Sequence, residues 1–268
     1  YQFMTTYQPR FDLIFRAGVQ AANKSSTMVG RYIDLSFVFP NETNQPDQQV
    51  DVSGNKEAAL TSINSFEIGG RYQISPTQLL DIEIFHSKLK DTTMQVNKGT
   101  ELVGNTFLTT LELEEIPSVA EQTGITVDWR YEYQQWSLST YLTWQNTEVF
   151  DQIEAAEMPF ITSDEPNKVT PEIYGGLTFD YKISRAFNFN VQSYYLSEHE
   201  MELRQPLGDY ESDAAVNTNL TLNYRYDKNI SGYAAIKNLS MSDESQSFYS
   251  DRLEPIYLLG IKLMFTKD

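Results

Sequence analysis

The sequence contains no cysteine, only two histidines and no long uninterrupted apolar run. Without thiols, disulfide frameworks and thiolate metal centres are excluded. No stretch approaches the ~18 consecutive apolar residues that a bilayer-spanning helix needs. Neither His86 nor His199 has a partner at metal-ligand spacing, so we expect no metal site and no cofactor. The signatures of serine hydrolases, P-loop proteins and zinc peptidases are missing as well, so we expect no catalytic residues and no enzyme.

Positive charge is also scarce: 20 Lys and Arg face 37 Asp and Glu, which gives a formal net charge of −17. This balance excludes a general nucleic-acid binder, because such proteins must attract phosphate. The acidic residues crowd the segments 148–170 and 198–213. They either keep exposed loops hydrated or attract cations, including divalent ions that bridge surface lipopolysaccharide.

The sequence is rich in strict alternation between apolar and polar residues. From Thr123 to Tyr133, Ile125, Val127 and Trp129 share one face, whereas the intervening Asp128 and Arg130 share the other. A strand turns successive side chains to opposite faces, so this run predicts one apolar and one charged wall. The pattern recurs in eleven runs, which we assign as strands: 1–7, 11–22, 64–74, 78–91, 122–133, 136–147, 171–183, 186–197, 214–226, 229–239 and 254–265.

The connections between these strands alternate in length. Five are tight, around residues 8–10, 75–77, 134–135, 184–185 and 227–229, and are made of turn-forming Pro, Ser, Asn and Asp or of short polar pairs. The other five are long: 23–63, 92–121, 148–170, 198–213 and 240–253. In the 92–121 connection, residues 94–96 and 107–113 are candidates to pair above the membrane. In the others, Arg31–Phe39 resembles a strand lying within its loop, and residues 153–158 are a candidate helical turn.

Short turns at one end and long loops at the other are typical of a transmembrane β-barrel, as are strands of roughly 9–12 residues. Aromatic residues beside the short turns fit an interfacial girdle on the periplasmic side; they are Tyr7, Phe11, Tyr72, Tyr131, Tyr133, Trp136, Tyr181, Phe187, Tyr224 and Tyr226. A mean hydropathy of −0.44 agrees with a barrel, because half of every strand faces water. We therefore predict an all-β, antiparallel, up-and-down meander.

This reading assigns each side chain to a face. We expect the apolar set to point outward to lipid: Ile125, Val127, Trp129, Leu220, Leu222, Leu259, Ile261 and Leu263. We expect the other set to point to the concave side: Asp128, Arg130, Asn219, Asn223, Gly260 and Lys262. The acid pair Asp81 and Glu83 falls on the concave side too, where charged walls are ordinary.

Several short segments resemble the C-terminal half of the barrel of TonB-dependent receptors. The hairpin 7–18, Gly54-Asn55 followed by Ser65–Gly69, and Thr170–Ile173 resemble successive strand entries of that family. Ile236–Leu239 resembles the element before its final loop, and Gly260–Phe265 resembles its last strand. Two features depart from the family: Thr266-Lys267-Asp268 follow the terminal Phe265, and the plug, the TonB-contacting box and the first half of the barrel are not in the sequence.

The resemblance implies that residues 1–268 form about half of a 22-stranded barrel, an open meander whose edge runs, 1–7 and 254–265, do not pair. It implies an outer-membrane receptor of a Gram-negative bacterium that takes up a scarce ligand, such as a ferric siderophore, haem, cobalamin or a glycan. The chain alone is then not active, and its ligand-binding residues are not identifiable. Because no export signal precedes Tyr1, we expect a mature, truncated chain or a fragment.

The partners implied are membrane lipid and lipopolysaccharide, the N-terminal half with its plug, the TonB complex acting through that plug, and a small-molecule or metal-chelate ligand. Two alternatives remain open. One is a passive outer-membrane porin or channel, and the other is a secreted soluble β-sheet protein, which would need a second apolar layer over Ile125, Val127 and Trp129.

Overall fold

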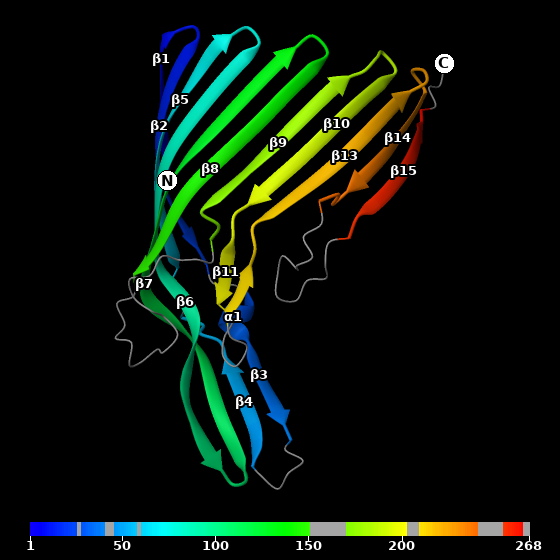
Figure 1. Cartoon of the computed structure of the whole chain (residues 1–268). Coiled ribbons are helices and arrows are strands. Elements are labelled where there is room, and N and C mark those ends of the chain that lie inside the picture. Colours follow the sequence, from blue (N-terminus) through cyan, green and yellow to red (C-terminus); the bar gives the residue numbers. More distant parts are fainter. Residues whose placement is uncertain are drawn as a thin grey trace.

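Eleven antiparallel strands form a single curved wall in a computed structural model of the chain (Figure 1). The structure describes residues 1–25, 28–40, 46–57, 60–150, 170–202, 209–240 and 254–264. The wall comprises β1 (Gln2–Arg10), β2 (Leu13–Lys24), β5 (Thr61–Ser75), β6 (Gln78–Val103), β7 (Thr106–Tyr133), β8 (Trp136–Phe150), β9 (Ile173–Lys182), β10 (Phe187–Leu196), β13 (Ala215–Arg225), β14 (Ile230–Lys237) and β15 (Ile256–Leu263). Within the described ranges, no helix is long and apolar enough to cross a membrane.

Each strand of the wall pairs with its neighbour in chain order, which confirms the predicted meander. The five tight connections lie together at the upper end of Figure 1, and the strand ends that lead into the long connections lie at the opposite end. Side chains close the turns locally: Asp227 Oδ1 accepts hydrogen bonds from the amides of Asn229 and Ile230 at 2.7 and 2.8 Å. The eleven strands agree with the predicted runs to within a few residues, apart from β6 and β7, which extend much further.

The connections differ from the prediction in three places, one tight turn and two long connections. Residues 92–121 are not a loop, because β6 and β7 continue as a ladder to a turn at Gly104. The expected pairing of 94–96 with 107–113 is confirmed for Gln95 and Val96, which pair with Leu113 and Glu112, whereas Met94 pairs with Glu114. The first turn lies at Phe11-Asp12, since Gln8 and Pro9 form an irregularity inside β1. Arg31–Phe39 is only partly a strand: α1 (Met28–Tyr32) precedes β3 (Asp34–Phe39), which pairs with β4 (Asp47–Ser53). The candidate turn at 153–158 lies outside the described residues.

The register aligns apolar side chains into one continuous outer face. Directly paired residues share a face, and one such row runs Phe15–Gly70–Ile82–Val127–Leu142 across five strands. At the other end of the wall, Leu259 and Ile261 are 86% and 80% exposed. Among the described residues no second sheet or helix layer covers this face, which argues against the soluble sandwich.

The apolar face has two limits along the strands. At the short-turn end it finishes in a chain of aromatic contacts, in which ring centroids of Tyr131 and Trp136 are 4.7 Å apart and those of Trp136 and Phe179 are 6.2 Å apart. At the long-loop end it stops where Phe66 pairs with His86 and Thr123 pairs with Asn146. The eight residue steps from Tyr133 to Ile125 span about 20 Å of height in a tilted strand, close to the ~25 Å apolar band of outer-membrane barrels.

The opposite face is polar and more enclosed. The buried polar residues of the wall, Asp81, Thr143 and Gln145, are only 8%, 2% and 6% exposed and all lie on this face. Side chains on the inside of a curved sheet converge, whereas those outside splay apart, so these exposures agree with a polar inner side. Within the described residues β1 pairs only with β2 and β15 only with β14, so the wall is open at both edges.

Candidate functional site on the inner wall

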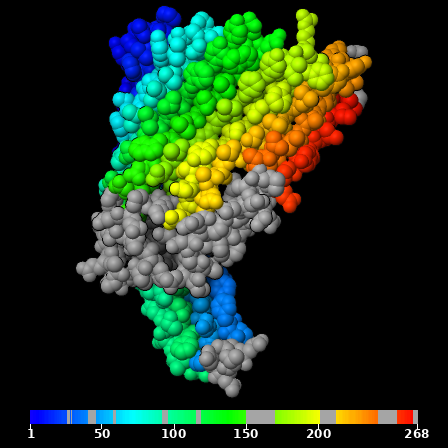
Figure 2. Space-filling view, in the orientation of Figure 1, coloured from blue at the N-terminus to red at the C-terminus, as the bar shows by residue number. Residues whose placement is uncertain are grey.

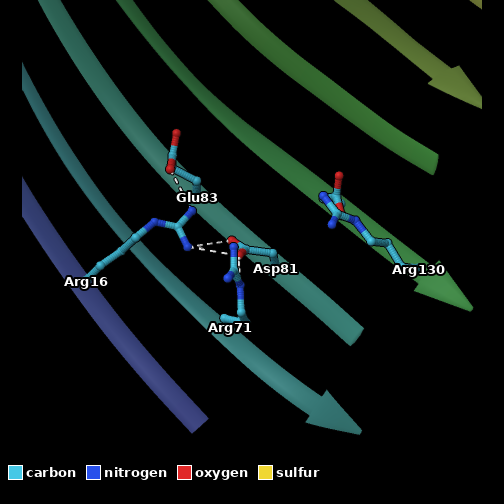
Figure 3. Close-up of polar contacts among 6 residues, drawn as sticks. Arg16, Arg71, Asp81, Glu83 and Arg130 are labelled. Atoms are coloured by element: carbon cyan, nitrogen blue, oxygen red, sulfur yellow. Dashed lines mark hydrogen bonds and ion pairs between the residues drawn. The ribbon is translucent and has the colours of Figure 1, made fainter. Parts of the chain in front are cut away.

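A cluster of charged residues occupies the inner face of β2, β5 and β6 (Figure 3). Arg16 Nη1 lies 2.7 Å from Asp81 Oδ1, and Arg16 Nη2 lies 2.7 Å from Glu83 Oε2. Arg71 Nε contacts the second carboxylate oxygen of Asp81, also at 2.7 Å. Asp81 thus accepts charge-assisted hydrogen bonds from two arginines, which compensates the burial of its carboxylate.

Arg16 reaches β6 because the strand between them carries a glycine at the crossing point. In the register, Arg16 pairs with Gly69 and Gly69 pairs with Glu83. A Cβ atom added to Gly69 would lie 2.9 Å from Arg16 Cζ, so the guanidinium passes through the space that a side chain would fill. The glycine therefore permits an ion pair between strands that are not neighbours.

The next strand continues the charge pattern. Asp81 lies directly opposite Asp128 of β7, a like-charge pair that alone would be destabilising. Arg130 offsets it, because its Nε lies 3.1 Å from Asp128 Oδ1 (Figure 3). Arg16, Arg71 and Arg130 together balance Asp81, Glu83 and Asp128. The exposed fraction rises from 10% at the Asp81 side chain to 51% at Arg71 and 56% at Arg130, so both arginines can meet a group in the lumen.

Further along the wall, tyrosines replace charges on the inner face. Tyr141 of β8 lies over Gly176 of β9, where an added Cβ would be 2.6 Å from the ring. Tyr233 of β14 lies in the same way over Gly260 of β15. Tyr194 of β10 pairs with Gly176 from the other side. These three tyrosines remain 36–45% exposed, which leaves their rings and hydroxyls available to a ligand.

Several polar side chains on the inner face are hydrogen-bonded. Thr126 and Thr143 hydroxyls are 2.9 Å apart, and Asn190 Nδ2 donates to Asp180 Oδ1 at 2.9 Å. Gln145 Nε2 donates to the carbonyl of Pro171 at 3.0 Å. These bonds fix side chains of adjacent strands in register and give the inner wall a defined polar surface.

The two histidines do not belong to this site. His86 lies on the outer face just beyond the apolar band, where its Nδ1 is 2.9 Å from Thr123 Oγ1. His199 begins the short strand β11 (His199–Glu202), which pairs with β12 (Asp209–Ser212) at the long-loop end. In the described part of the chain, no three His, Cys, Asp or Glu residues are grouped to hold a metal ion.

Of the face assignments, the structure places Ile125, Val127 and Trp129 in the apolar rows, and Asp128 and Arg130 on the opposite face. The second half of the wall agrees. Leu220, Leu222, Leu259, Ile261 and Leu263 belong to the outer rows, and Asn219, Asn223, Gly260 and Lys262 to the inner ones. Sequence reasoning did not identify the arginine–acid cluster or the tyrosine–glycine pairs. In both, a long side chain lies over a glycine at an inner-face position, so an inner-face glycine is the sequence feature that could have indicated them.

No known family model matches the sequence, and no curated protein is significantly similar to it. Solved structures do resemble it. The siderophore receptor PirA from Acinetobacter baumannii superposes with a TM-score of 0.74 at 17% identity, over 98% of this chain and 40% of that receptor. The ferric-catecholate import receptor Fiu from E. coli superposes with a TM-score of 0.67 at 14% identity, over 98% of this chain and 34% of that receptor. A ferric enterobactin receptor (PfeA) from Pseudomonas aeruginosa superposes with a TM-score of 0.66 at 14% identity, over 90% of this chain and 34% of that receptor.

The chain therefore has the fold of a large part of a siderophore-receptor barrel, and the resemblance to TonB-dependent receptors is confirmed at the level of the fold. It spans well under half of the length of the receptors that it matches. These neighbours are transport receptors rather than enzymes.

Proposed function

We propose that this chain is the C-terminal part of the barrel of a TonB-dependent receptor that imports a ferric siderophore across the outer membrane of a Gram-negative bacterium. The observation that carries the proposal is the open wall of eleven strands, apolar outside and polar inside, with the fold of about 40% of a siderophore receptor. A receptor barrel of 22 strands has twice the number of strands in this wall.

The open edges of the wall support the proposal that further strands complete the barrel. The outer strands β1 and β15 run in the same direction, because they are the first and last of eleven antiparallel strands. Each leaves a row of backbone amides and carbonyls without a partner strand in the described sheet, which hydrocarbon does not tolerate. Further strands of the same receptor would close the barrel, and a plug inside it would couple transport to the TonB complex.

The inner wall favours a siderophore among the ligand classes that the sequence left open. Three half-exposed tyrosines and the half-exposed guanidinium groups of Arg71 and Arg130 offer hydroxyl donors, N–H donors and aromatic rings to an aromatic metal chelate. Haem is less favoured, because neither histidine lies on the inner wall: His86 points to the outer face and is bonded to Thr123, and His199 lies in the β11–β12 pair. We infer that Tyr141 and Tyr194, on either side of Gly176, are ligand-contacting residues.

The proposal is tested by growth under iron limitation. The complete receptor that contains this chain is expressed in a Gram-negative strain that lacks its own catecholate receptors, and growth is scored on ferric enterobactin and on ferrichrome, a hydroxamate. We expect enterobactin-dependent growth that disappears when TonB is deleted. The double variant Tyr141→Ala/Tyr194→Ala should lower uptake of radiolabelled iron at least tenfold, whereas Leu142→Ala on the outer face should leave it unchanged. Growth on neither chelate, or growth independent of TonB, would contradict the proposal.

A separate measurement tests the incompleteness of the wall. A closed outer-membrane barrel keeps its folded mobility in detergent electrophoresis unless it is heated. We expect residues 1–268 alone to show no such heat-dependent shift, because the edges β1 and β15 remain open. A heat-dependent shift together with a cross-link between cysteines introduced into β1 and β15 would favour a small self-sufficient barrel.

A further inference from the structure

At the long-loop end the sheet of the wall continues into a four-stranded extension that projects from it. The hairpin β3–β4 lies beside the extended parts of β6 and β7, in the lower part of Figures 1 and 2. β4 pairs with β7 in parallel, from Asp47 opposite Thr106 to Ser53 opposite Glu112. The strand order β3–β4–β7–β6 forms what we call the blade.

One face of the blade is apolar. Across the strands, Leu35 aligns with Val52 and Leu111, and Phe37 aligns with Val50. Nearer the tip, Phe39 and Gln48 align with Phe107 and Leu102. Leu35, Phe37, Phe39, Phe107 and Leu102 are 42–57% exposed. Exposed apolar side chains gathered on one face mark an interaction surface rather than an ordinary solvated loop.

Lipid is not the expected cover for this face. The apolar band of the wall ends near Ile125, and Phe107 lies further along the same strand. At ~3.3 Å per residue this separation is roughly 60 Å along β7. The opposite face of the blade carries acidic side chains, including Asp51, Glu101 and Glu112. The blade is therefore amphipathic in the aqueous region beyond the wall.

The outer edge of the blade is free among the described residues, because β3 pairs only with β4. The amide of Gly54 donates to the carbonyl of Ile33, so odd-numbered residues of β3 form the hydrogen-bonded pairs with β4. The backbone groups of Asp34, Ser36 and Val38 consequently point to the open edge. β3 contains no lysine, proline or bulge, the devices that normally block edge pairing.

The blade is itself built by strand addition. The hairpin β3–β4 joins the edge of β7 from a distant part of the chain and extends its sheet. After this addition β3 becomes the new edge, and it carries three of the large apolar residues of the exposed face. The same geometry is thus available once more for a strand from outside.

We propose that the free edge of β3 binds an extended segment of a partner polypeptide, which adds to the blade as a fifth strand. The segment that fits alternates apolar residues, which cover Leu35, Phe37 and Phe39, with basic residues on the other face. Asp34 and Asp51 give that other face its negative charge beside the edge. Backbone hydrogen bonds supply affinity, and the alternate side chains supply specificity.

The test uses the protein in detergent micelles and a fluorescent peptide, Thr-Val-Lys-Phe-Lys-Val-Lys-Val-Thr. We expect saturable binding by fluorescence anisotropy. Val38→Pro removes an amide that points to the open edge without removing a β3–β4 hydrogen bond, so it should weaken binding at least tenfold. Val38→Thr keeps the amide and should bind like the unmodified protein. Circular dichroism and amide hydrogen exchange of β4 check that both variants keep the blade.

Two further probes separate strand addition from other modes. A peptide with the same side chains but N-methyl groups on alternate residues should not bind, since it cannot pair with the edge. Equal binding of the methylated peptide, or equal affinity of Val38→Pro and Val38→Thr, would overturn the proposal. So would a concentration-dependent dimer, abolished by Val38→Pro and indifferent to the peptide, because it would assign the edge to a second copy of this chain.

Discussion

The guanidinium of Arg16 lies over Gly69, in the space that a side chain at residue 69 would occupy. This relationship connects β2 to β6 across β5 and holds the carboxylates of Asp81 and Glu83. A long side chain on one strand can thus form ion pairs with the next strand but one, provided that the strand between them has a glycine at the crossing point. The adjacent glycine, Gly70, lies on the outer face, where an added Cβ meets Phe15 at an ordinary 3.5 Å.

The first prediction compares these two glycines. Gly69→Val should displace Arg16 and leave Asp81 with Arg71 as its remaining arginine, at a cost of about 1–3 kcal/mol in unfolding free energy. Gly70→Val adds the same atoms without breaking an ion pair and should cost less. Urea titrations of both variants, made in the complete receptor and reconstituted in lipid vesicles, provide the measurement. A loss at Gly70 equal to or greater than that at Gly69 would show that the ion pair is not the cause.

The second prediction concerns the two faces of β13. Leu222→Arg places a charge on the outer face near mid-strand and should destabilise the folded protein by roughly 2–4 kcal/mol. Asn223→Arg places it on the inner face, where water is available, and should cost far less. The same vesicle titration compares them. Similar losses for the two variants would contradict the assigned faces.

The third prediction concerns the pH dependence of the blade. Ser36 and Gln49 donate hydrogen bonds to Asp51 at 2.7 and 2.9 Å and lower the pKa of its carboxyl group. A lowered pKa in the folded state stabilises the β3–β4 pairing above the ordinary Asp pKa of about 3.9. That contribution is lost as the pH falls through the lower folded value.

Amide hydrogen exchange of β3 and β4 measures this effect. Exchange corrected for the intrinsic pH dependence should become faster below about pH 4, and Asp51→Asn should remove that dependence while leaving the wall unchanged. Protection that is independent of pH in the unmodified protein would mean that the Asp51 hydrogen bonds do not stabilise the hairpin.

The strands of the wall could be predicted because alternation with period two is a local signal. In β7, the polarity of each residue from Ile125 to Arg130 indicates the face on which its side chain lies. The need to keep the apolar side chains on one face then fixes which residues point to which side. The lengths of β6 and β7 were underestimated, because residues 92–121 are mostly polar and lie beyond the apolar band of the wall, where alternation has no lipid to respond to. Their pairing depends on the ladder itself and on the left-handed Gly104 at the turn.

The long-range contacts could not be predicted. In the parallel pairing of β4 with β7, Asp47 lies opposite Thr106. Neither of these two short strand segments has a sequence pattern that indicates which strand it pairs with. Sequence parity places Arg16, Asp81 and Glu83 on the inner face, but only the register shows that Gly69 lies between them. An inner-face glycine opposite a long side chain is the feature to look for in related walls.

The central claim is that one face of this wall meets lipid and the other meets water, and cysteine scanning tests it most directly. This chain has no cysteine, so single cysteines from Ile125 to Tyr131 in β7, introduced into the complete receptor, can each carry a spin label in vesicles. Labels at Ile125, Val127, Trp129 and Tyr131 should be relaxed mainly by oxygen dissolved in the bilayer, and labels at Thr126, Asp128 and Arg130 mainly by a water-soluble nickel chelate. Accessibility that does not alternate, or that alternates in the opposite phase, would contradict the account.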